Sequence, residues 1–388
     1  MILWHSCAPW SGTGYGVETA LWTRKLRDMG HEVVISTYWG LNGAPTLWDG
    51  ITVLPAFGAN YASPSLQQHA KHLGPDLVIT LGDIWVKDPA VLAELPVAHW
   101  LPCDCRPMSI ADRNVVETSR SQLIAMSRFG HDRYLEAGFT GAQYVPHAVE
   151  MDVWTIPGDR QVLRDEAGIG PDTFVVGVNA ANSDAIRKAP SEMMLAFAKF
   201  IRQRPDSLLW LHTGVHCDGG QDLECLAENL GITDKIRVVD QYRYTAGLVQ
   251  PADLQKWYGA IDVMLAATYG EGFGIPIVES LACGTPVITT RCSSMEELNP
   301  DGIAVDGEPF YNGVHRAWWI RPFISGMVAA LEQAYEQRHD VDQVKLRESV
   351  AQYDVSRVAE EHMGPAIDVL LERMKRLERK VEAAEFAV

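Results

Sequence analysis

The most informative chemistry in this sequence lies between residues 270 and 288. A glycine-rich loop, residues 270–274, follows the apolar run Val263–Ala266 and precedes a helical pattern with Pro276 in its first turn. Proline fits that turn because the N–H group that it lacks has no intrahelical partner there. The unpaired backbone N–H groups of a helix start can bind a phosphate, and glycine lets the backbone approach it closely. The loop therefore predicts an anion-binding site.

Two carboxylates flank this predicted anion site. Glu271 lies in the loop, and Glu279 lies within the helical pattern that follows. A carboxylate accepts hydrogen bonds well from vicinal hydroxyl groups. A phosphate site with carboxylates beside it favours a ligand with both phosphate and polyol parts. The chain has 50 Asp and Glu residues, so two Glu residues at this spacing also arise by chance, and the prediction depends on the complete 270–288 block.

Apolar runs alternate with helical patterns along nearly the whole chain, and these elements must position the loop. Short β-branched runs separated by helices indicate βαβ units and a parallel sheet covered on both faces. Turn-forming residues interrupt the alternation between positions 149 and 172, after which it restarts. We therefore predict an α/β fold with two Rossmann-like, doubly wound domains that face a cleft. Ligands of such sheets bind at the carboxyl ends of the strands.

The predicted boundaries follow from this alternation. The first domain spans residues 1–155, the second spans 170–355, and a helical tail occupies 356–388. The amphipathic pattern in the tail has too few heptads for a coiled coil, so we expect that helix to pack on the protein's own surface. The predicted strands are residues 2–4, 31–36, 77–80, 97–101, 123–126, 174–178, 208–211, 236–239, 263–266 and 287–289. The main predicted helices are residues 17–29, 191–204, 252–260 and 364–388.

The 270–288 block resembles the E-x7-E region of the retaining GT-B glycosyltransferases of the family 4 type (glycosyl transferase group 1). Residues 12–16 look like the family's glycine-rich first loop, and residues 187–189 are similar to its Arg-Lys-Gly element. Residues 127–130 and 144–147 resemble its pre-hinge segments. The resemblance covers most of the chain up to residue 311. It implies the GT-B fold and transfer of a sugar from a nucleotide-diphosphate sugar with retention of the anomeric configuration.

The resemblance also implies roles for individual residues. Glu271 would lie at the donor sugar and Glu279 at the nucleotide ribose, while the loop amides and Lys188 would hold the diphosphate. Many relatives have an Arg after the first strand of the second domain, where this chain has the uncharged Asn179. Arg187 and Lys188 are therefore the expected cationic pair. The expected donor-binding residues are Gly14, Tyr15, Gly16, Asn179, Gly272, Phe273, Gly274, Ile275 and Glu279.

Cleavage of the donor builds negative charge on the leaving phosphate and positive charge on the sugar. The cationic pair and the amides at the helix start would stabilise the negative charge. No Asp-x-Asp metal motif is evident at the phosphate, and helix N–H groups together with cations can replace a metal there. We therefore expect no metal and no further cofactor. The resemblance implies that a leaving phosphate oxygen takes the acceptor's proton.

Asp104 is the candidate for the acceptor side. It follows the predicted strand 97–101, at the carboxyl end where a parallel sheet presents functional groups. Relatives place polar residues of this region beside the donor sugar and the acceptor, and Cys105 falls about where many of them have His. Asp104 could orient the acceptor hydroxyl. It could equally cap a helix predicted near residues 108–116, with Pro107 at the helix start.

Three tryptophans follow predicted strands in loops. Trp10, Trp39 and Trp85 could stack on sugar rings, whose C–H groups form an apolar surface. Large aromatic side chains are mostly buried, so core packing is the favoured interpretation for each of them.

Other ligand classes fit the glycine-rich loop at residues 12–16 less well. Its third glycine is one place early for a dinucleotide-binding motif, and the second strand does not end in an acidic residue. No Gly-Lys-Ser/Thr sequence follows, which excludes a P-loop. Three alternatives to the transferase stay open: a catalytically inactive nucleotide-sugar-binding protein, a nucleotide-sugar epimerase of the same architecture, and a glycosyltransferase that acts on modified nucleic acid bases.

Composition limits the partners and the compartment. The formal net charge of -17 disfavours nucleic acid, because phosphate contacts need clustered Lys and Arg. No apolar run is long enough to span a membrane, and the N-terminus does not read as a signal peptide. Seven scattered cysteines do not form a disulfide framework, which predicts the reducing cytoplasm. The acceptor is left open as a glycan, a lipid-linked molecule, a protein or a small molecule.

Overall fold

The computed structural model describes residues 1–58, 61 and 63–385, with side chains up to residue 376. The chain divides into two compact units. The first comprises Met1–His147, Gly313–Ala317 and Ser356–Val388, and the second comprises Ala148–Asn312 and Trp318–Val355. This grouping joins the C-terminal segment, which the sequence prediction set apart as a tail, to the first unit. Residues 386–388 of the predicted helix lie outside the described residues.

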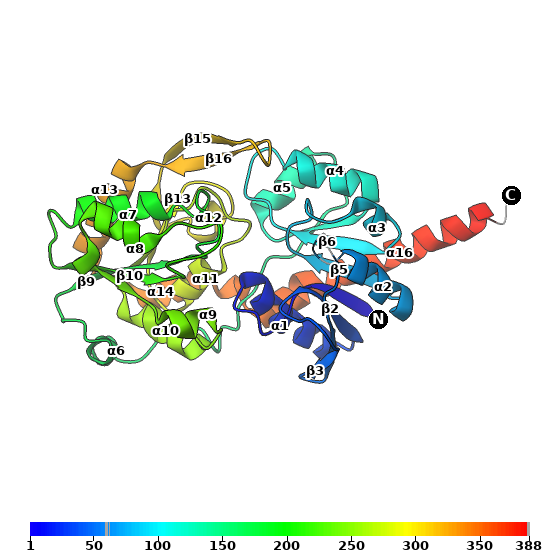
Figure 1. Cartoon of the computed structure of the whole chain (residues 1–388), viewed down its shortest axis with the longest axis horizontal. Helices are drawn as coiled ribbons and strands as arrows, with labels where there is room; N and C mark the ends of the chain where they lie inside the picture. Colours follow the sequence, from blue (N-terminus) through cyan, green and yellow to red (C-terminus); the bar gives the residue numbers. More distant parts are fainter. Residues whose placement is uncertain (59–60, 62, 386–388) are drawn as a thin grey trace. The chain divides into compact units, whose positions relative to one another are not determined.

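The first unit is built on an eight-stranded sheet (Figure 1). Its strand order is β3-β4-β2-β1-β5-β6-β7-β8, and only β3 runs antiparallel to its neighbour. The strands are β1 Ile2–Cys7, β2 Val33–Trp39, β3 Thr46–Trp48, β4 Ile51–Leu54, β5 Leu77–Leu81, β6 Val97–Leu101, β7 Gln122–Ala125 and β8 Gln143–Tyr144. The chain leaves β1 toward β2 on one side and returns to β5 on the other, so the topological switch point lies beside β1.

Helices complete the first unit. They are α1 Gly14–Asp28, α2 Ser63–Leu73, α3 Pro89–Ala93, α4 Ile110–Ser119, α5 Arg128–Glu136 and α16 Gly364–Glu385. Residues 364–376 of the last helix pack on the protein's own surface, as predicted, with Ile367, Leu370 and Met374 buried; the side chains of the rest of the predicted helix lie outside the described residues. Arg373 Nη1 donates to Gln122 Oε1 at 3.0 Å, which ties α16 to β7.

The prediction that Trp10, Trp39 and Trp85 pack in the core is wrong. Their exposed fractions are 43%, 66% and 43%. Each lies at or beyond the carboxyl end of its strand, where the sheet no longer covers it. The buried positions are taken by other tryptophans earlier in strands and helices: Trp4, Trp22 and Trp100.

The second unit contains a six-stranded parallel sheet with the order β11-β10-β9-β12-β13-β14. Its strands are β9 Phe174–Asn179, β10 Ser207–His212, β11 Ile236–Val238, β12 Val263–Ala266, β13 Val287–Thr290 and β14 Ile303–Val305. Its helices are α6 Arg160–Glu166, α7 Pro190–Phe200, α8 Leu223–Leu230, α9 Gln241–Thr245, α10 Pro251–Ala260, α11 Ile275–Ala282, α12 Met295–Leu298, α13 Ile324–Gln337, α14 Gln343–Ser349 and the short α15 Val355–Val358 at the boundary to the first unit. A separate pair, β15 Gly307–Asn312 and β16 Ala317–Pro322, has no counterpart in the sequence prediction.

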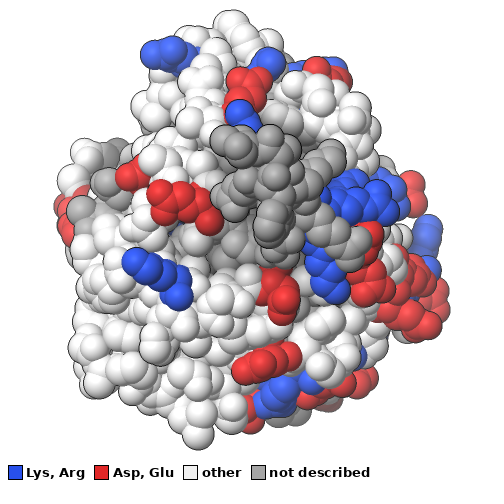
Figure 2. Space-filling view, turned by 90° about the vertical axis from the view of Figure 1, so that its right-hand side faces the viewer, with Lys and Arg blue, Asp and Glu red and all other residues white. Residues whose placement is uncertain are grey.

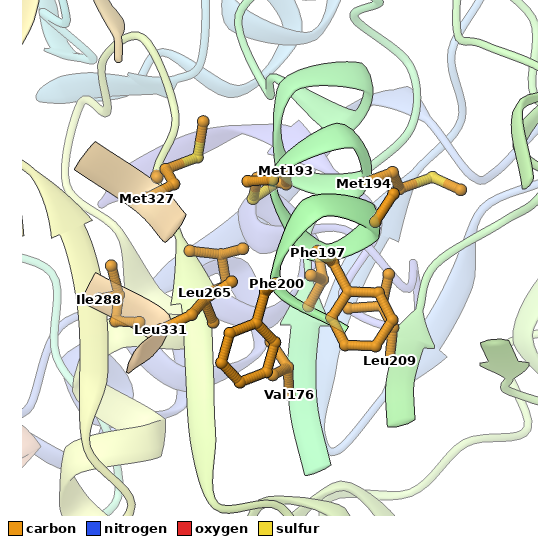
Figure 3. Close-up of a cluster of buried hydrophobic side chains, with 14 of the residues drawn as sticks. Val176, Met193, Met194, Phe197, Phe200, Leu209, Leu265, Ile288, Met327 and Leu331 are labelled. Atoms are coloured by element: carbon orange, nitrogen blue, oxygen red, sulfur yellow. The ribbon is translucent and has the colours of Figure 1, made fainter. Parts of the chain in front are cut away.

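Both faces of the second sheet are covered, as a doubly wound fold requires. Figure 3 shows Phe197 and Phe200 of α7 against Val176 and Leu209, and all four are buried. On the opposite face of β9, a Cβ atom at Gly177 would lie 2.7 Å from the Trp257 ring of α10. Successive residues of a strand point to opposite faces, so the two helices pack on opposite sides of β9.

The predicted α/β fold of two doubly wound halves is confirmed, and most predicted strands agree with the observed ones to within a few residues. Among the described residues no helix combines the length and the hydropathy needed to cross a bilayer.

Candidate active site

The glycine-rich loop lies between β12 and α11, where the sequence placed it. Helix α11 begins at Ile275, and Gly274 at its N-cap has a φ of 111°. Gly284, directly after the C-cap residue Cys283, has a φ of 75°. Both angles lie in the left-handed region that favours glycine. The predicted order of strand, glycine-rich loop, helix and strand is therefore confirmed.

Two serines after the neighbouring strand β13 hold this loop in place. Glu271 N donates to Ser293 Oγ at 2.9 Å, and Ser294 Oγ donates to the Glu271 carbonyl at 2.9 Å. The Phe273 ring is buried and lies edge-on to Tyr353, with 5.3 Å between ring centroids. The sequence analysis did not single out these serines. Because functional side chains gather at the carboxyl ends of parallel strands, their position after the predicted strand 287–289 could have identified them.

Arg187 and Lys188 converge on the Glu271 carboxylate. Lys188 Nζ lies 2.7 Å from Oε1 and 2.9 Å from Oε2, and Arg187 Nη1 lies 3.2 Å from Oε2. Burial works to raise the pKa of Glu271, but the Lys188 and Arg187 charges outweigh burial and the pKa lies below its ordinary value. Glu271 is therefore ionised at neutral pH. The structure brings together the three residues that were predicted separately from two distant segments.

Two loops at the carboxyl ends of adjacent strands produce this arrangement. Arg187 and Lys188 lie between β9 and α7, and Glu271 follows β12, which pairs with β9. Tyr269 N donates to the Arg187 carbonyl at 2.8 Å and joins the loops directly. Asp184 Oδ1 accepts from Arg187 N at 2.9 Å and fixes the turn before the cationic pair.

A buried hydrogen-bond chain leads to Glu279 in the second turn of α11. Tyr258 OH, from α10, donates to Glu279 Oε2 at 2.9 Å and accepts from Asn179 Nδ2 at 2.8 Å. His212 Nδ1, at the end of β10, donates to Asn179 Oδ1 at 3.2 Å. Burial lowers the pKa of His212 to about 4, so its ring is neutral at physiological pH. The predicted residues Asn179 and Glu279 are therefore linked through Tyr258, which the sequence analysis missed.

Gly14, Tyr15 and Gly16, which were predicted to lie in a loop that binds the donor, lie in a helix. Helix α1 begins at Gly14, earlier than the predicted start at residue 17, because Thr13 Oγ1 accepts from Gly16 N at 3.0 Å and caps it. Gly14, Tyr15 and Gly16 thus form the first turn of α1. Tyr15 OH lies 3.5 Å from Asp83 Oδ2, beyond the end of β5.

The interpretation of Asp104 as a helix cap is wrong. Helix α4 begins at Ile110, and its N-cap is Ser109, whose Oγ lies 3.5 Å from Asp112 N. Pro107 therefore does not occupy a helix start. Asp104 itself is half-buried after β6.

Two buried titratable groups of the first unit, Asp112 and Lys87, were not predicted by the sequence analysis. Burial, followed by the Asp83 and Asp104 carboxylates, raises the pKa of Asp112 to about 8. Burial lowers the pKa of Lys87 to about 8, and its Nζ lies 4.6 Å from the centre of the Tyr38 ring. Nothing in the local sequence distinguishes these residues from exposed ones, because their burial depends on the folded sheet.

Residues 178–317 match the family described as glycosyl transferases group 1. The D-inositol 3-phosphate glycosyltransferase 2 of Catenulispora acidiphila is 31% identical over 153 residues, which are 38% of this chain and 34% of that protein. The D-inositol 3-phosphate glycosyltransferase of Segniliparus rotundus is 27% identical over 57% of this chain and 51% of its own. This chain therefore spans about a third to a half of the length of these curated relatives.

Solved structures show the same fold over nearly the whole chain. Sucrose-phosphate synthase from Thermosynechococcus elongatus gives a TM-score of 0.70 at 15% identity and covers 99% of this chain and 100% of its own. Anabaena HepE in complex with UDP and glucose gives a TM-score of 0.67 at 17% identity, with 95% and 99% covered. Residues 178–317 are thus similar to the glycosyl transferases group 1 family, and the chain has the GT-B glycosyltransferase fold. The matched segment 178–317 includes the whole Arg187–Lys188–Glu271 cluster and Glu279.

The arrangement of charged groups within residues 178–317 indicates which ligand it can bind. A helix start and two cations offer a site for a diphosphate, with an ionised carboxylate between them and a second, buried carboxylate on the helix. Among the residues that the structure describes, no group of three or more His, Cys, Asp and Glu side chains could hold a metal ion.

Proposed function

We propose that this protein transfers a sugar from a nucleotide-diphosphate sugar to an acceptor, with retention of configuration. The observation that carries the proposal is the convergence of Arg187 and Lys188 on Glu271 beside the loop that opens α11. The names of the curated relatives and the complex of HepE with UDP and glucose support the same reaction class and the same donor class.

In the proposed complex the donor diphosphate lies at the start of α11, between the amides of residues 272–275 and the cationic pair. The Glu271 carboxylate contacts both cations when no donor is bound. A bound diphosphate would compete for the same cations, which releases Glu271 to interact with the donor sugar. Glu279, oriented by Tyr258, would accept hydrogen bonds from the ribose hydroxyls.

In the proposed chemical step the bond from the anomeric carbon to the phosphate oxygen breaks and the acceptor oxygen attacks the same face of the sugar. Lys188, Arg187 and the amides at the helix start stabilise the charge that develops on the leaving phosphate. A leaving phosphate oxygen takes the acceptor's proton, so the step needs no separate base. The proposal includes no metal, since fixed cations and N–H groups serve the diphosphate.

The first unit contributes the acceptor side in this proposal. Asp104 would orient the acceptor hydroxyl, and the first turn of α1, Gly14 to Gly16, would contact the donor. The acceptor class stays open between a glycan, a lipid-linked molecule, a protein and a small molecule. We propose a cytoplasmic location, which the seven free cysteines support.

Nucleic acid is a poor candidate for the acceptor. Figure 2 shows one face of the molecule, on which Lys and Arg side chains are interspersed with Asp and Glu side chains. The formal net charge of the chain is -17. Nucleic acid binding needs a basic patch or stripe that outweighs such repulsion.

Purified protein should be screened against UDP-, GDP- and ADP-sugars for thermal stabilisation and for release of nucleotide. Lys188→Ala should then lower kcat about 10²–10³-fold, with a smaller change in donor KM, because the lost charge matters most in the transition state. Lys199→Ala, which removes an exposed ammonium from the same helix region, is the matched control. Absence of turnover with all three donor classes, or equal kcat in Lys188→Ala and the parent, contradicts the proposal.

A further inference from the structure

A polar pocket lies in the second unit at the amino-terminal ends of the strands, whereas the candidate active site lies at their carboxyl ends. Asp262 directly precedes β12 and Pro286 directly precedes β13, and both line the pocket. Glu271 and Ser293 follow the other ends of the same strands. Strand β12 has 4 residues, which separates the two edges by roughly 13 Å. The pocket is therefore distinct from the donor site.

The pocket walls carry an excess of positive charge. Arg160, Arg338 and His339 line it together with a single carboxylate, Asp262. That carboxylate is already occupied, because Oδ1 lies 2.7 Å from Arg160 Nη2 and Oδ2 accepts from Arg164 Nη2 at 2.9 Å. The lining thus contains one carboxylate and two guanidinium groups, and that carboxylate also binds Arg164, in a chain whose formal net charge is -17.

The carboxylate in the loop that bounds the pocket is directed toward a backbone amide. Asp342, in the loop that bounds the pocket, accepts from Lys345 N at 3.0 Å and caps α14. Arg338 stacks on its own helix, with its guanidinium carbon 4.0 Å from the centre of the Tyr335 ring. Its contacts in the described structure are therefore to an aromatic ring and a carbonyl group rather than to a carboxylate.

Arg160 has one donor that the protein does not use. Its Nη2 atom is paired with Asp262 Oδ1, whereas its Nε atom makes no hydrogen bond within the described part of the chain. A guanidinium presents its N–H groups in a planar fork that matches the oxygens of a phosphate. A ligand oxygen in the pocket would therefore give the Arg160 guanidinium a second partner beside Asp262.

The pocket is large enough for such a ligand. Its volume is about 150 Å³, whereas a cavity needs only about 10–15 Å³ to hold one water molecule. We propose that this pocket is a second anion site, which binds the phosphate group of inorganic phosphate or of a small phosphorylated molecule. Arg160 and Arg338 bind the phosphate oxygens, and His339 contributes a third donor at the rim.

Calorimetric titration of the full chain with inorganic phosphate, against sodium chloride of equal ionic strength, tests this proposal. The parent and Lys188→Ala should bind phosphate with the same Kd, because Lys188 lies at the carboxyl ends of the strands and the pocket lies at their amino-terminal ends. Arg338→Gln should weaken binding at least tenfold. Arg202→Gln removes an exposed guanidinium elsewhere in the second unit and should leave the Kd unchanged. A parallel titration with a hexose phosphate shows whether a phosphorylated molecule binds more tightly than free phosphate.

Two outcomes overturn the proposal. One is the absence of saturable phosphate binding to the parent. The other is binding that survives Arg338→Gln and is lost in Lys188→Ala, which assigns phosphate to the donor site. If Arg338→Gln does not fold, Arg160→Gln replaces it, and the rise in Tm on adding phosphate serves as a second readout: a rise in the parent that is absent in Arg160→Gln supports the pocket, and an equal rise in both overturns it.

Discussion

At the scale of single residues, one carboxylate shared by two adjacent cations is the central feature of the segment 178–317. Lys188 contacts both oxygens of Glu271, and Arg187 contacts one of them. The three side chains are largely buried, so their attraction is screened less than that of a surface pair. Asp184 Oδ2 also lies 3.6 Å from Arg187 Nε, so two carboxylates face the two cations. An anionic ligand would therefore compete with these carboxylates for the same cations.

Tyr258 acts on the proposed donor site through Glu279. Tyr258→Phe removes the hydrogen bond to the Glu279 carboxylate and leaves Asn179 Nδ2 without its acceptor. A hydrogen bond to a charged group contributes about 1.5–3 kcal/mol, so the Kd for a nucleotide sugar should rise at least tenfold, with a smaller change in kcat. The measurement is calorimetric titration of the donor.

Tyr335→Phe is the control, because it removes the same hydroxyl group from a tyrosine elsewhere. Its hydroxyl lies 3.2 Å from Asp206 Oδ2 on the surface, away from Glu279. Equal donor affinity in Tyr258→Phe and Tyr335→Phe would remove Tyr258 from the site.

Asp112 should make the stability of the protein depend on pH. Its pKa is raised from 3.8 to about 8, so the folded chain keeps a proton that the unfolded chain releases between these values. The free energy of unfolding therefore falls as the pH rises through this window. Asp112→Asn removes the titrating group. Relative to the parent, the variant should gain up to about 4 kcal/mol between pH 5 and pH 8, at 1.36 kcal/mol per pH unit.

Urea unfolding at both pH values checks this prediction. Asp132→Asn, which changes an exposed carboxylate on α5, is the control and should follow the parent. A constant difference between Asp112→Asn and the parent from pH 5 to pH 8 would show that Asp112 ionises normally.

At the scale of secondary-structure elements, the ends of α11 decide where Glu271 and Glu279 lie. Gly274 ends the loop at the start of the helix, and Gly284 turns the chain from the helix into β13. Because both glycines adopt positive φ, the helix can be short and still connect two adjacent parallel strands. The anion-binding end of the helix is thereby fixed at the carboxyl edge of the sheet.

Gly284→Ala should destabilise the protein more than a comparable change at another helix end. The new Cβ would lie 2.7 Å from Gln343 Cβ, and the φ of 75° adds strain. We expect a loss of about 2–4 kcal/mol in the free energy of unfolding. Gly231, at the C-cap of α8, has a φ of 67°, but a Cβ added there would have no atom within 4 Å, so Gly231→Ala should lose only about 1–2 kcal/mol. Urea unfolding of both variants tests the difference, and equal losses contradict the packing argument.

At the scale of the whole molecule, the chain returns to its first unit after the second one is complete. Helix α16 buries Ile367 and Leu370 fully, although residue 364 lies more than two hundred residues beyond the first-unit core in sequence. The C-terminal helix is therefore a structural part of the first unit. Truncation before it would expose an apolar surface on that unit.

Leu370→Ala should lower the free energy of unfolding by about 2–5 kcal/mol, as for other buried leucines. The adjacent Val369 is 39% exposed, so Val369→Ala should change it by less than about 1 kcal/mol. Thermal or urea unfolding of the two variants provides the measurement. Similar, small effects of both substitutions would mean that α16 does not pack on the first unit in solution.

The sequence alone was sufficient to predict the order of the strands and helices and the main features of the glycine-rich loop at residues 270–274. The alternation of β-branched runs with helical patterns predicted most strands, because each pattern reflects the local burial of its own element. Pro276 and Gly284 predicted the ends of α11 for the same local reason. The resemblance of residues 187–189 and 270–288 to one family also singled out Arg187, Lys188, Glu271 and Glu279 before any contact between them was known.

Tertiary structure decided which distant residues meet and which are covered. Ser293, Tyr258 and Asp112 have no distinctive local pattern, and their partners depend on strand order, which periodicity does not encode. The exposure of Trp10 and Trp39 likewise depends on where the sheet ends rather than on residue type. The cap at Thr13 and the two-stranded pair β15–β16 involve few residues, so the hydrophobic pattern was too short to predict them. Local hydrophobic patterns thus determined the elements, and only long-range packing determined the neighbours of each side chain.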